Sequence, residues 1–279
     1  MRVQGFHDGE TGTITYLVVC TTTASCAVID PVLGFDPVTG HTSDKPLRPV
    51  LEAMAGLSCA WVLETHIHAD HLSGATTLRA AVGGRLGIGS GVVEVERNLG
   101  KLFNFGLETA RFDHLFRDGE RFSIGTLKGE VLATPGHTPD SLSYLIGDTV
   151  FVGDTLFMPD SGTARCDFPG GDAAMLYASI QRILALPPQT RIMVCHDYKA
   201  AGRDAFAWET TVAEQRAKNI HVHDGVGEAE YTALRRGRDA TLAMPRLMLP
   251  SVQVNLRAGA MPEPEGNGIR YIRIPIDAA

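Results

Sequence analysis

The sequence predicts a mixed α/β fold, and two observations point to it. Short runs rich in Val, Ile, Thr and Tyr, which favour β-strands, alternate with segments whose apolar residues recur at helical spacing. The second half of the chain also repeats the outline of the first: a hairpin-like pair of strands, a strand that ends in a polar loop carrying His or Asp, and a helix. The repetition lies in the order of the elements, not in the residues. We therefore expect two α/β halves of similar outline.

The first half begins with two strand-like runs, residues 13–19 and 26–30, which are separated by a short polar turn and predict a hairpin. After a stretch rich in Gly and Pro, apolar residues between positions 47 and 54 recur at helical spacing and predict a helix. A brief apolar strand at 61–63 then leads directly into a segment crowded with His and Asp. A second helix is expected at 73–82.

The second half opens with four strand-like runs, at residues 121–124, 127–133, 141–145 and 149–152. Asp172 is a suitable N-cap for a helix that runs to about Leu186, where Pro187 and Pro188 end it. The last clear strand is 191–195, and a polar His-Asp-Tyr sequence follows it directly.

The remainder of the chain predicts a smaller C-terminal part. Beyond Gly202 the pattern is helical to about residue 241 and then rich in Pro and Gly. We expect a catalytic core at residues 1–202 and a helical and irregular appendage at 203–279 that packs on it. A length of 279 residues allows one large domain or two smaller ones.

Composition excludes several classes of function. The net charge is −7 and no Lys/Arg-rich run occurs, which argues against nucleic-acid binding because that depends on clustered cations. No apolar stretch approaches the roughly 18–20 residues of a membrane span, and the first residues lack the apolar core of a signal peptide. The five cysteines are odd in number and show no CxxC spacing, so neither a disulfide framework nor a cysteine zinc site is indicated. We expect a cytoplasmic enzyme.

Four side chains of metal-ligand type stand within six residues, namely His66, His68, Asp70 and His71. In an extended segment the two histidines that are two residues apart project to one side. Three imidazoles and one carboxylate in so small a space would be costly to bury unless a metal or hydrogen bonds compensate them. The segment therefore predicts a metal site at the end of a strand.

Three more ligand-type residues follow apolar strands in the same way: His137, Asp154 and His196. Strand ends gather at one rim of a sheet, so all of them can reach one site. The other five histidines lack this context, and we expect them at the surface; they are His7, His41, His114, His221 and His223.

These motifs resemble the metallo-β-lactamase superfamily. The T-H-x-H-x-D-H motif is present as residues 65–71, T-P-G-H-T as 134–138 and G-D-T as 153–155, and His196 comes last in the expected order. The resemblance implies a four-layer αββα sandwich.

Two branches of that superfamily keep all of these ligands: the glyoxalase II thioester hydrolases and the persulfide dioxygenases, also called sulfur dioxygenases or the ethylmalonic-encephalopathy-protein-like family. The sequences D-H-L-S-G-A at 70–75, R-C-D-F at 165–168 and H-D-Y at 196–198 look like the dioxygenase branch. Segments around Asp30 and Asn255 also look like that branch, although no role follows for them. The G-T-A-R-C-D-F sequence resembles a longer bacterial subgroup.

The dioxygenase resemblance implies one Fe(II) per chain, held by His66, His137 and Asp154 as a 2-His-1-carboxylate triad that leaves open positions for a substrate sulfur and O2. It implies that glutathione persulfide is oxidised with O2 and water to sulfite and glutathione. The remaining ligand-type residues would then orient the ligands or hydrogen-bond water or substrate: His68, Asp70, His71 and His196.

The glyoxalase alternative implies a binuclear zinc site for hydroxyacylglutathione hydrolysis. In it His66, His68 and His137 would hold one metal. Asp70, His71 and His196 would hold the second, with Asp154 bridging the two.

The candidate catalytic residues are Arg165, Tyr198 and Asp70. Arg165 could orient the site or bind a glutathione carboxylate, or it could form a salt bridge with Asp167. Tyr198 could contact the glutathione or pack beneath His196. Cys166 lies near the expected site, but nothing in the sequence indicates a lowered thiol pKa. The family resemblance also implies a homodimer.

Overall fold

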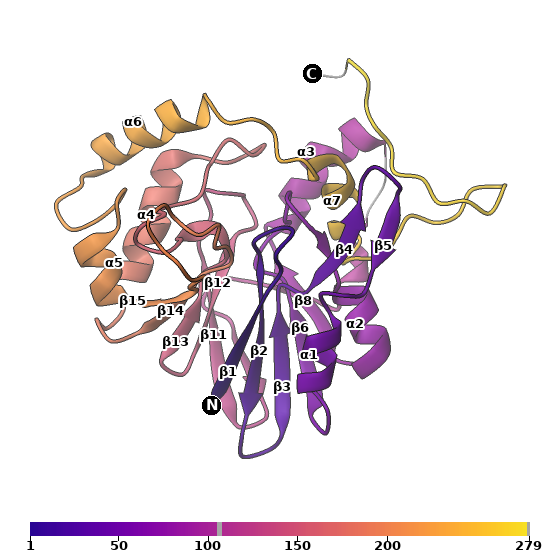
Figure 1. Ribbon diagram of the computed structural model, residues 1–279, viewed down its shortest axis with the longest axis horizontal. Coiled ribbons are helices and arrows are strands. Elements are labelled where there is room, and N and C mark those ends of the chain that lie inside the picture. Colours follow the sequence, from indigo (N-terminus) through magenta and orange to yellow (C-terminus); the bar gives the residue numbers. More distant parts are fainter. Residues whose placement is uncertain (105–107, 278–279) are drawn as a thin grey trace.

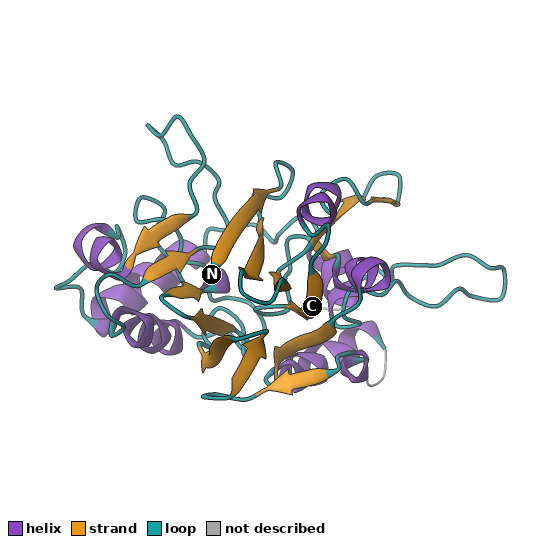
Figure 2. Cartoon of the chain, turned by 90° about the horizontal axis from the view of Figure 1, so that it is seen from below, coloured by secondary structure: helices purple, strands orange, loops and turns teal. Residues whose placement is uncertain are grey.

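Two six-stranded β-sheets pack face to face, and helices cover the outer face of each (Figures 1 and 2). The computed structural model describes residues 1–104 and 108–277. Each half of the chain contributes one sheet and most of the helices that cover it, and α7 from the C-terminal half joins the layer over the first sheet. The expected four-layer αββα sandwich is therefore confirmed.

The first sheet has the strand order β1-β2-β3-β6-β8-β9. Its strands are Arg2–His7, Ile14–Cys20, Ser25–Ile29, Ser58–Leu63, Arg85–Gly89 and His114–Phe116, in that order. β3 and β6 are parallel neighbours, and Ile29 is in register with Leu63. The residues that follow these two strands therefore meet at the same edge of the sheet.

The second sheet has the order β10-β11-β12-β13-β14-β15. Its strands are Arg121–Ile124, Leu127–Ala133, Leu142–Ile146, Thr149–Phe151, Arg191–Met193 and Glu209–Thr211. β13 and β14 are parallel, and the other pairs are antiparallel. A third, three-stranded sheet has the order β5-β4-β7, with β4 at Val32–Asp36, β5 at His41–Ser43 and β7 at Leu72–Ser73.

β2 illustrates how the layers are held together. Every residue of this strand is buried, because the sheet is covered on both faces. Ile14, Tyr16 and Val18 point into the core between the two sheets. Leu17 and Val19, which alternate with them, point to the core beneath the helices.

The helices divide between the two outer faces. α1 (Arg48–Ala53), α2 (Ala75–Val82), α3 (Val92–Phe103) and α7 (Met248–Asn255) contribute to the core over the first sheet. α4 (Ala173–Leu184), α5 (Val212–Lys218) and α6 (Glu228–Asp239) contribute to the core over the second. Asp172 caps α4 as expected, since its carboxylate accepts a hydrogen bond from the Met175 amide at 2.8 Å. No helix in the described part of the chain is long and apolar enough to cross a bilayer.

Several elements were not expected from the sequence. β1, β8, α3 and β9 add a strand and a β-α-β unit to the first half. β15 lies in a stretch expected to be helical; it is a strand because it pairs antiparallel with β14 at the end of the second sheet. Both β15 and α7 lie beyond residue 202 and pack on the sandwich. Residues 256–277 carry no helix or strand; Leu256 and Ala258 are still buried in the core, and part of the segment that follows extends away from the sandwich (Figure 1). The division at residue 202 stays a prediction.

Candidate metal centre

The seven ligand-type residues named from the sequence lie at neighbouring strand ends of both sheets. Four of them stand on the loop of residues 64–71 that follows β6. His137 follows β11, Asp154 lies in a 3-10 turn at Gly153–Thr155 after β13, and His196 follows β14. Their ligand atoms gather into two main clusters, and within each cluster these atoms lie within 4.8 Å of one another.

The first cluster joins His66, His137 and Asp154, which are all buried. Neither His66 Nε2 nor Asp154 Oδ1 has a hydrogen-bond partner among the described residues. His137 Nε2 lies 3.6 Å from Asp154 Oδ2. Buried polar atoms without partners are costly, and a metal ion between them would remove that cost. Two imidazoles and one carboxylate are a donor set that fits a divalent metal ion.

The second cluster consists of His68, Asp70, His71 and His196. Within the described chain, His68 Nδ1, Asp70 Oδ2 and the Nε2 atoms of the other two histidines lack hydrogen-bond partners. His196 Nε2 lies 3.3 Å from Asp70 Oδ2 and 3.3 Å from Asp154 Oδ1. Asp154 therefore lies between the two clusters.

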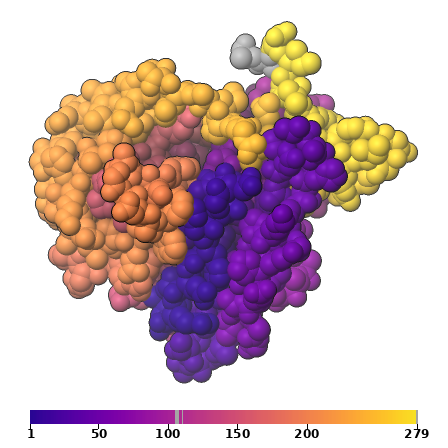
Figure 3. Space-filling model, viewed as in Figure 1, coloured from indigo at the N-terminus to yellow at the C-terminus, as the bar shows by residue number. Residues whose placement is uncertain are grey.

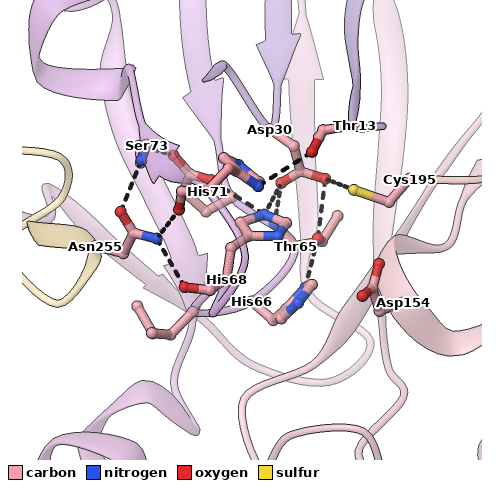
Figure 4. Close-up of polar contacts among 12 residues, drawn as sticks. Thr13, Asp30, Thr65, His66, His68, His71, Ser73, Asp154, Cys195 and Asn255 are labelled. Atoms are coloured by element: carbon pink, nitrogen blue, oxygen red, sulfur yellow. Dashed lines mark hydrogen bonds and ion pairs between the residues drawn. The ribbon is translucent and has the colours of Figure 1, made fainter. Parts of the chain in front are cut away.

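Asp30, directly after β3, fixes the orientation of two histidine rings (Figure 4). The Thr65 amide donates to Asp30 Oδ1 at 2.7 Å, and the Thr65 hydroxyl donates to Oδ2 at 2.9 Å. That hydroxyl oxygen lies 3.0 Å from His66 Nδ1, so the ring N–H donates to it. His68 Nε2 lies 3.1 Å from Asp30 Oδ1 and donates in the same way. Both rings are left with a lone pair that faces a cluster, at His66 Nε2 and His68 Nδ1.

The other three histidine rings are held through Nδ1. His137 Nδ1 donates to the Arg165 carbonyl oxygen, 2.6 Å away. The Thr13 hydroxyl lies 3.3 Å from His71 Nδ1 and 3.4 Å from His196 Nδ1. Because Nδ1 of each ring is engaged, Nε2 is the nitrogen available to a metal.

The charge states of His66, His68 and Asp70 favour metal binding, whereas burial raises the pKa of Asp154. Burial, with a neighbouring imidazole, lowers the pKa of His66 and of His68 well below the ordinary value, so both rings are neutral at pH 7. Burial by itself would raise the pKa of Asp70, yet His196 and His71 hold it well below its usual range. Neutral imidazoles and an ionised carboxylate are the forms that coordinate metals.

Asn255 ties the C-terminal helix α7 to the metal-binding loop. Its side-chain amide donates to the carbonyl oxygens of His68 and His71, at 2.8 and 2.9 Å. Its Oδ1 accepts from the Ser73 amide at 2.7 Å. A residue more than 180 positions away thus satisfies three backbone groups of the loop region (Figure 4).

The Arg165 side chain forms the salt bridge that the sequence left open. Its guanidinium contacts both carboxylate oxygens of Asp167 at 2.5 Å and donates to the Ala243 carbonyl at 2.7 Å. The backbone carbonyl of Arg165, and not the guanidinium, is what holds His137.

Tyr198 and Cys166 lie close to the ligands in different ways. The Tyr198 ring stacks on His196 with centroids 5.6 Å apart, although the residue is 64% exposed. The Cys166 thiol donates to Asp239 Oδ2 at 3.2 Å, and burial together with this carboxylate raises its pKa to about 12. Cys166 is therefore protonated at neutral pH, as an unreactive thiol would be.

One of the five histidines expected at the surface is buried, so that prediction was wrong for His221. The residue is 5% exposed, and its Nδ1 accepts a hydrogen bond from the Thr163 amide at 3.0 Å. Burial, with the nearby charge of Arg238, lowers its pKa to about 4. Residues 161–163 pack over the His221 ring. They lie about 60 positions away in the sequence, so the residues around His221 do not predict this contact.

Sequence reasoning gave no role to three residues that hold the ligands: Thr13, Asp30 and Asn255. The strand-end position of Asp30 is the same signal that identified His137 and His196. Thr13 and Asn255 carry no such signal, because their contacts come from distant parts of the chain.

Known proteins share this fold. The family model described as "Metallo-beta-lactamase superfamily" matches residues 9–196 of the chain. A "probable metallo-hydrolase" of Burkholderia pseudomallei is 48% identical over 294 residues, covering 100% of both chains. "Glyoxylase B2" of Dictyostelium discoideum is 44% identical over 284 residues, covering 99% of this chain and 97% of that one. The chain spans only 65% of the "beta-lactamase hydrolase-like protein" of Xylella fastidiosa.

More distant matches include the mitochondrial "persulfide dioxygenase ETHE1" of Homo sapiens, 30% identical over 210 residues that cover 74% of this chain and 70% of that one. The crystal structure of ETHE1 from Myxococcus xanthus has a TM-score of 0.75 and 31% identity, covering 93% of this chain and 100% of that one. With its αββα sandwich and its seven ligand-type residues at the strand ends, the chain belongs to the metallo-beta-lactamase superfamily.

Proposed function

We propose that this protein is a persulfide dioxygenase that holds one Fe(II) per chain and oxidises glutathione persulfide with O2 and water to sulfite and glutathione. One observation carries the proposal: the ligand atoms of His66, His137 and Asp154 lie within 4.8 Å of one another, and His68 belongs to other groups. The His68 ring lies 4.0 Å from the His66 ring between centroids, but its Nε2 donates to Asp30, and His68 groups with Asp70, His71 and His196. Two histidines and one carboxylate on one face are the ligand set of non-haem iron oxygenases.

In this proposal His66, His137 and Asp154 are the metal ligands, and the other residues of the centre position them. Bound Fe(II) would supply open coordination positions at which the terminal persulfide sulfur and O2 can meet. Asp30, acting through Thr65, orients His66, and the Arg165 carbonyl orients His137. The second cluster lies beside this face, where its side chains can hydrogen-bond water or substrate and where Asp70 is the most exposed of them.

The relationship to ETHE1 proteins supports the same proposal. The similarity to the Myxococcus xanthus structure extends over 93% of the chain. The human relative carries the printed name of a persulfide dioxygenase. The expected homodimer stays a prediction.

A glyoxalase II-like hydrolase with two zinc ions is the second candidate. It is favoured by the unpartnered atoms of the second cluster and by the position of Asp154 between the clusters, where it could bridge two metals. The similarity to Glyoxylase B2 points in the same direction. In this alternative His68 would join the first metal, and Asp70, His71 and His196 would hold the second.

Substituting one buried histidine from each cluster separates the two candidates. For a mononuclear iron enzyme, His137→Ala should lose the iron and the O2 uptake with glutathione persulfide together. His71→Ala should keep close to one iron per chain, because His71 lies outside the first cluster.

The binuclear alternative predicts another pattern. Each substitution would then remove about one of two zinc ions, and both would reduce hydrolysis of S-lactoylglutathione. Metal analysis of the two purified variants beside the wild type, with both activity assays, is the measurement. Equal loss of metal from the two variants would contradict the dioxygenase proposal.

A further inference from the structure

One peptide group, between Arg165 and Cys166, connects the first cluster to helix α6. Its carbonyl oxygen accepts from His137 Nδ1 at 2.6 Å, and its N–H donates to Asp239 Oδ2 at 2.9 Å. A peptide group is planar and trans, so its C=O and its N–H point in opposite directions. Asp239, the last residue of α6, therefore lies on the side of this peptide that faces away from His137.

A buried ion pair fixes the Asp239 carboxylate. Its Oδ1 accepts from Arg235 Nε at 2.8 Å, and a second nitrogen of the same guanidinium lies 2.6 Å from Oδ1. Arg235 also donates to the Thr163 carbonyl at 3.0 Å. Arg235 and Asp239 are only 2% and 6% exposed, and charge-assisted hydrogen bonds hold them in one geometry. Oδ2 is thereby directed at Cys166, where it accepts from both the amide and the thiol.

The backbone around this peptide is closely packed. A Cβ atom at Gly171 would lie 2.3 Å from the Cys166 carbonyl oxygen and 2.9 Å from the His137 carbonyl oxygen, so no larger residue fits there. Helix α6 packs against α4 (Figure 1), and its orange residues form the upper left surface of the molecule in Figure 3. A helix at the surface thus reaches the first cluster through one rigid peptide.

We propose that Asp239 is a positioning residue of the metal centre, which orients His137 through the 165–166 peptide and makes its imidazole a stronger metal ligand. A carboxylate that accepts from the N–H polarises the peptide, so the carbonyl oxygen becomes a stronger acceptor. The stronger bond to Nδ1–H fixes the His137 ring and raises the basicity of Nε2. Helix α6, which lies beyond the matched residues 9–196, therefore belongs to the metal centre.

The inference rests on the proposed function only in taking His137 as a metal ligand, and it holds equally for one iron ion or two zinc ions. Asp239→Asn is the test variant. The guanidinium of Arg235 is the strongest donor nearby, so it keeps the single oxygen of Asn. The NH2 group then faces the Cys166 amide and cannot accept from it.

Competition with a chromophoric chelator for Co(II) measures the metal affinity of the purified protein. We expect Asp239→Asn to bind Co(II) about tenfold more weakly. This is the lower end of the range of about 10–100-fold for partners of metal ligands, because Asp239 acts through a peptide group.

Tyr231→Phe is the matched control. Tyr231 stands on the same helix and donates to the Thr163 hydroxyl at 3.0 Å, so Phe removes a contact between α6 and the same loop. The 165–166 peptide keeps both of its hydrogen bonds. Co(II) affinity should therefore stay within about twofold of the wild type.

A spectroscopic measurement distinguishes an effect on His137 from a general loosening of the loop. In the proton NMR spectrum of the Co(II)-loaded protein, the ring N–H protons of coordinated histidines are shifted away from the other signals. We expect one of these ring N–H signals to shift or to exchange faster with solvent in Asp239→Asn, while the others stay in place. Tyr231→Phe should change none of them.

A double variant covers the case in which Asp239→Asn does not fold. Arg235→Met combined with Asp239→Leu replaces the buried ion pair by apolar side chains and leaves no unpaired charge. It also removes the acceptor of the Cys166 amide. We expect the same loss of Co(II) affinity, about tenfold.

The outcomes separate this inference from the proposed function. Co(II) affinity within about twofold of the wild type in the variants of Asp239, an equal loss in Tyr231→Phe, or ring N–H signals that do not change would overturn the role of Asp239. Weaker Co(II) binding in Asp239→Asn of a protein that oxidises no persulfide would contradict the dioxygenase and keep the inference. Persulfide oxidation by the wild type with unchanged Co(II) affinity in Asp239→Asn would do the reverse.

Discussion

Replacing Asp30 by Asn should weaken metal binding without unfolding the protein. Asp30 has a φ of +50°, in the left-handed region that Asp and Asn tolerate better than most residues. Asn therefore keeps the shape and the backbone conformation. It replaces one accepting oxygen by an NH2 group, which cannot accept a hydrogen bond.

The size of the effect follows from the bonds that are lost. One carboxylate oxygen accepts from the Thr65 amide and from His68 Nε2, and the other accepts from the Thr65 hydroxyl that orients His66. If the NH2 group replaces the oxygen that accepts from the Thr65 amide and from His68, two hydrogen bonds are lost. At about 1 kcal/mol for each bond, the orientation of the ligands loses about 2 kcal/mol. That corresponds to about a 30-fold weaker metal affinity, within the range of about 10–100-fold seen for partners of metal ligands.

Competition with a chelator, followed by metal analysis, measures the affinity. Asp118→Asn is the matched control, because Asp118 is an exposed carboxylate that pairs with Arg182 away from the ligands. Burial raises the pKa of Asp30 to about 6, so the ionised carboxylate destabilises the folded protein when no metal is bound. Asn removes this charge, and the metal-free Asp30→Asn variant should therefore have a Tm no lower than that of the metal-free wild type. Metal affinity within twofold of the wild type would refute the role given to Asp30.

Three further predictions concern residues around the centre. Asn255→Ala leaves three backbone groups unpaired, so the free energy of unfolding should fall by about 3 kcal/mol in urea denaturation, and unchanged stability would contradict the assigned contacts. The raised pKa of Cys166 predicts that iodoacetamide does not alkylate it in the folded protein at pH 8; rapid labelling in peptide mass spectrometry would show otherwise. The pKa of His221 is about 4 in the folded protein and about 6.5 in the unfolded chain, so the unfolded chain takes up the proton first and stability should drop by up to about 3 kcal/mol as pH falls from 6.5 to 4. His221→Gln should lose that part of the pH dependence, and an unchanged profile would count against the buried neutral ring.

The parts of the fold that could be predicted are those with local signals. The strands of the second sheet follow apolar runs between turn residues, and α4 follows a capping aspartate and ends before two prolines. α3 had such a signal as well, because Val92, Val95, Leu99 and Phe103 recur at helical spacing and are all buried. β15 had no local signal. It is a strand because it pairs with β14, although the sequence around it has a helical pattern.

The candidate metal centre also combines residues that have a local sequence signal with residues that have none. The candidate ligands stand in short motifs at strand ends, so the sequence alone predicts that they lie together. Their supports come from far along the chain: Asp30 lies 35 residues before Thr65, and Asn255 lies 187 residues after His68. The separation into two clusters depends on which ring nitrogen each support engages, and residue spacing contains no information on that choice.

The central claim is that one iron ion at His66, His137 and Asp154 serves an oxygen-dependent reaction. Its most direct test is the metal content of the wild-type protein, measured together with O2 uptake and sulfite release from glutathione persulfide and with hydrolysis of S-lactoylglutathione. We predict close to one iron per chain, one O2 consumed for each sulfite released, and no significant thioester turnover. Two zinc ions per chain, with thioester hydrolysis and no O2 uptake, would contradict it.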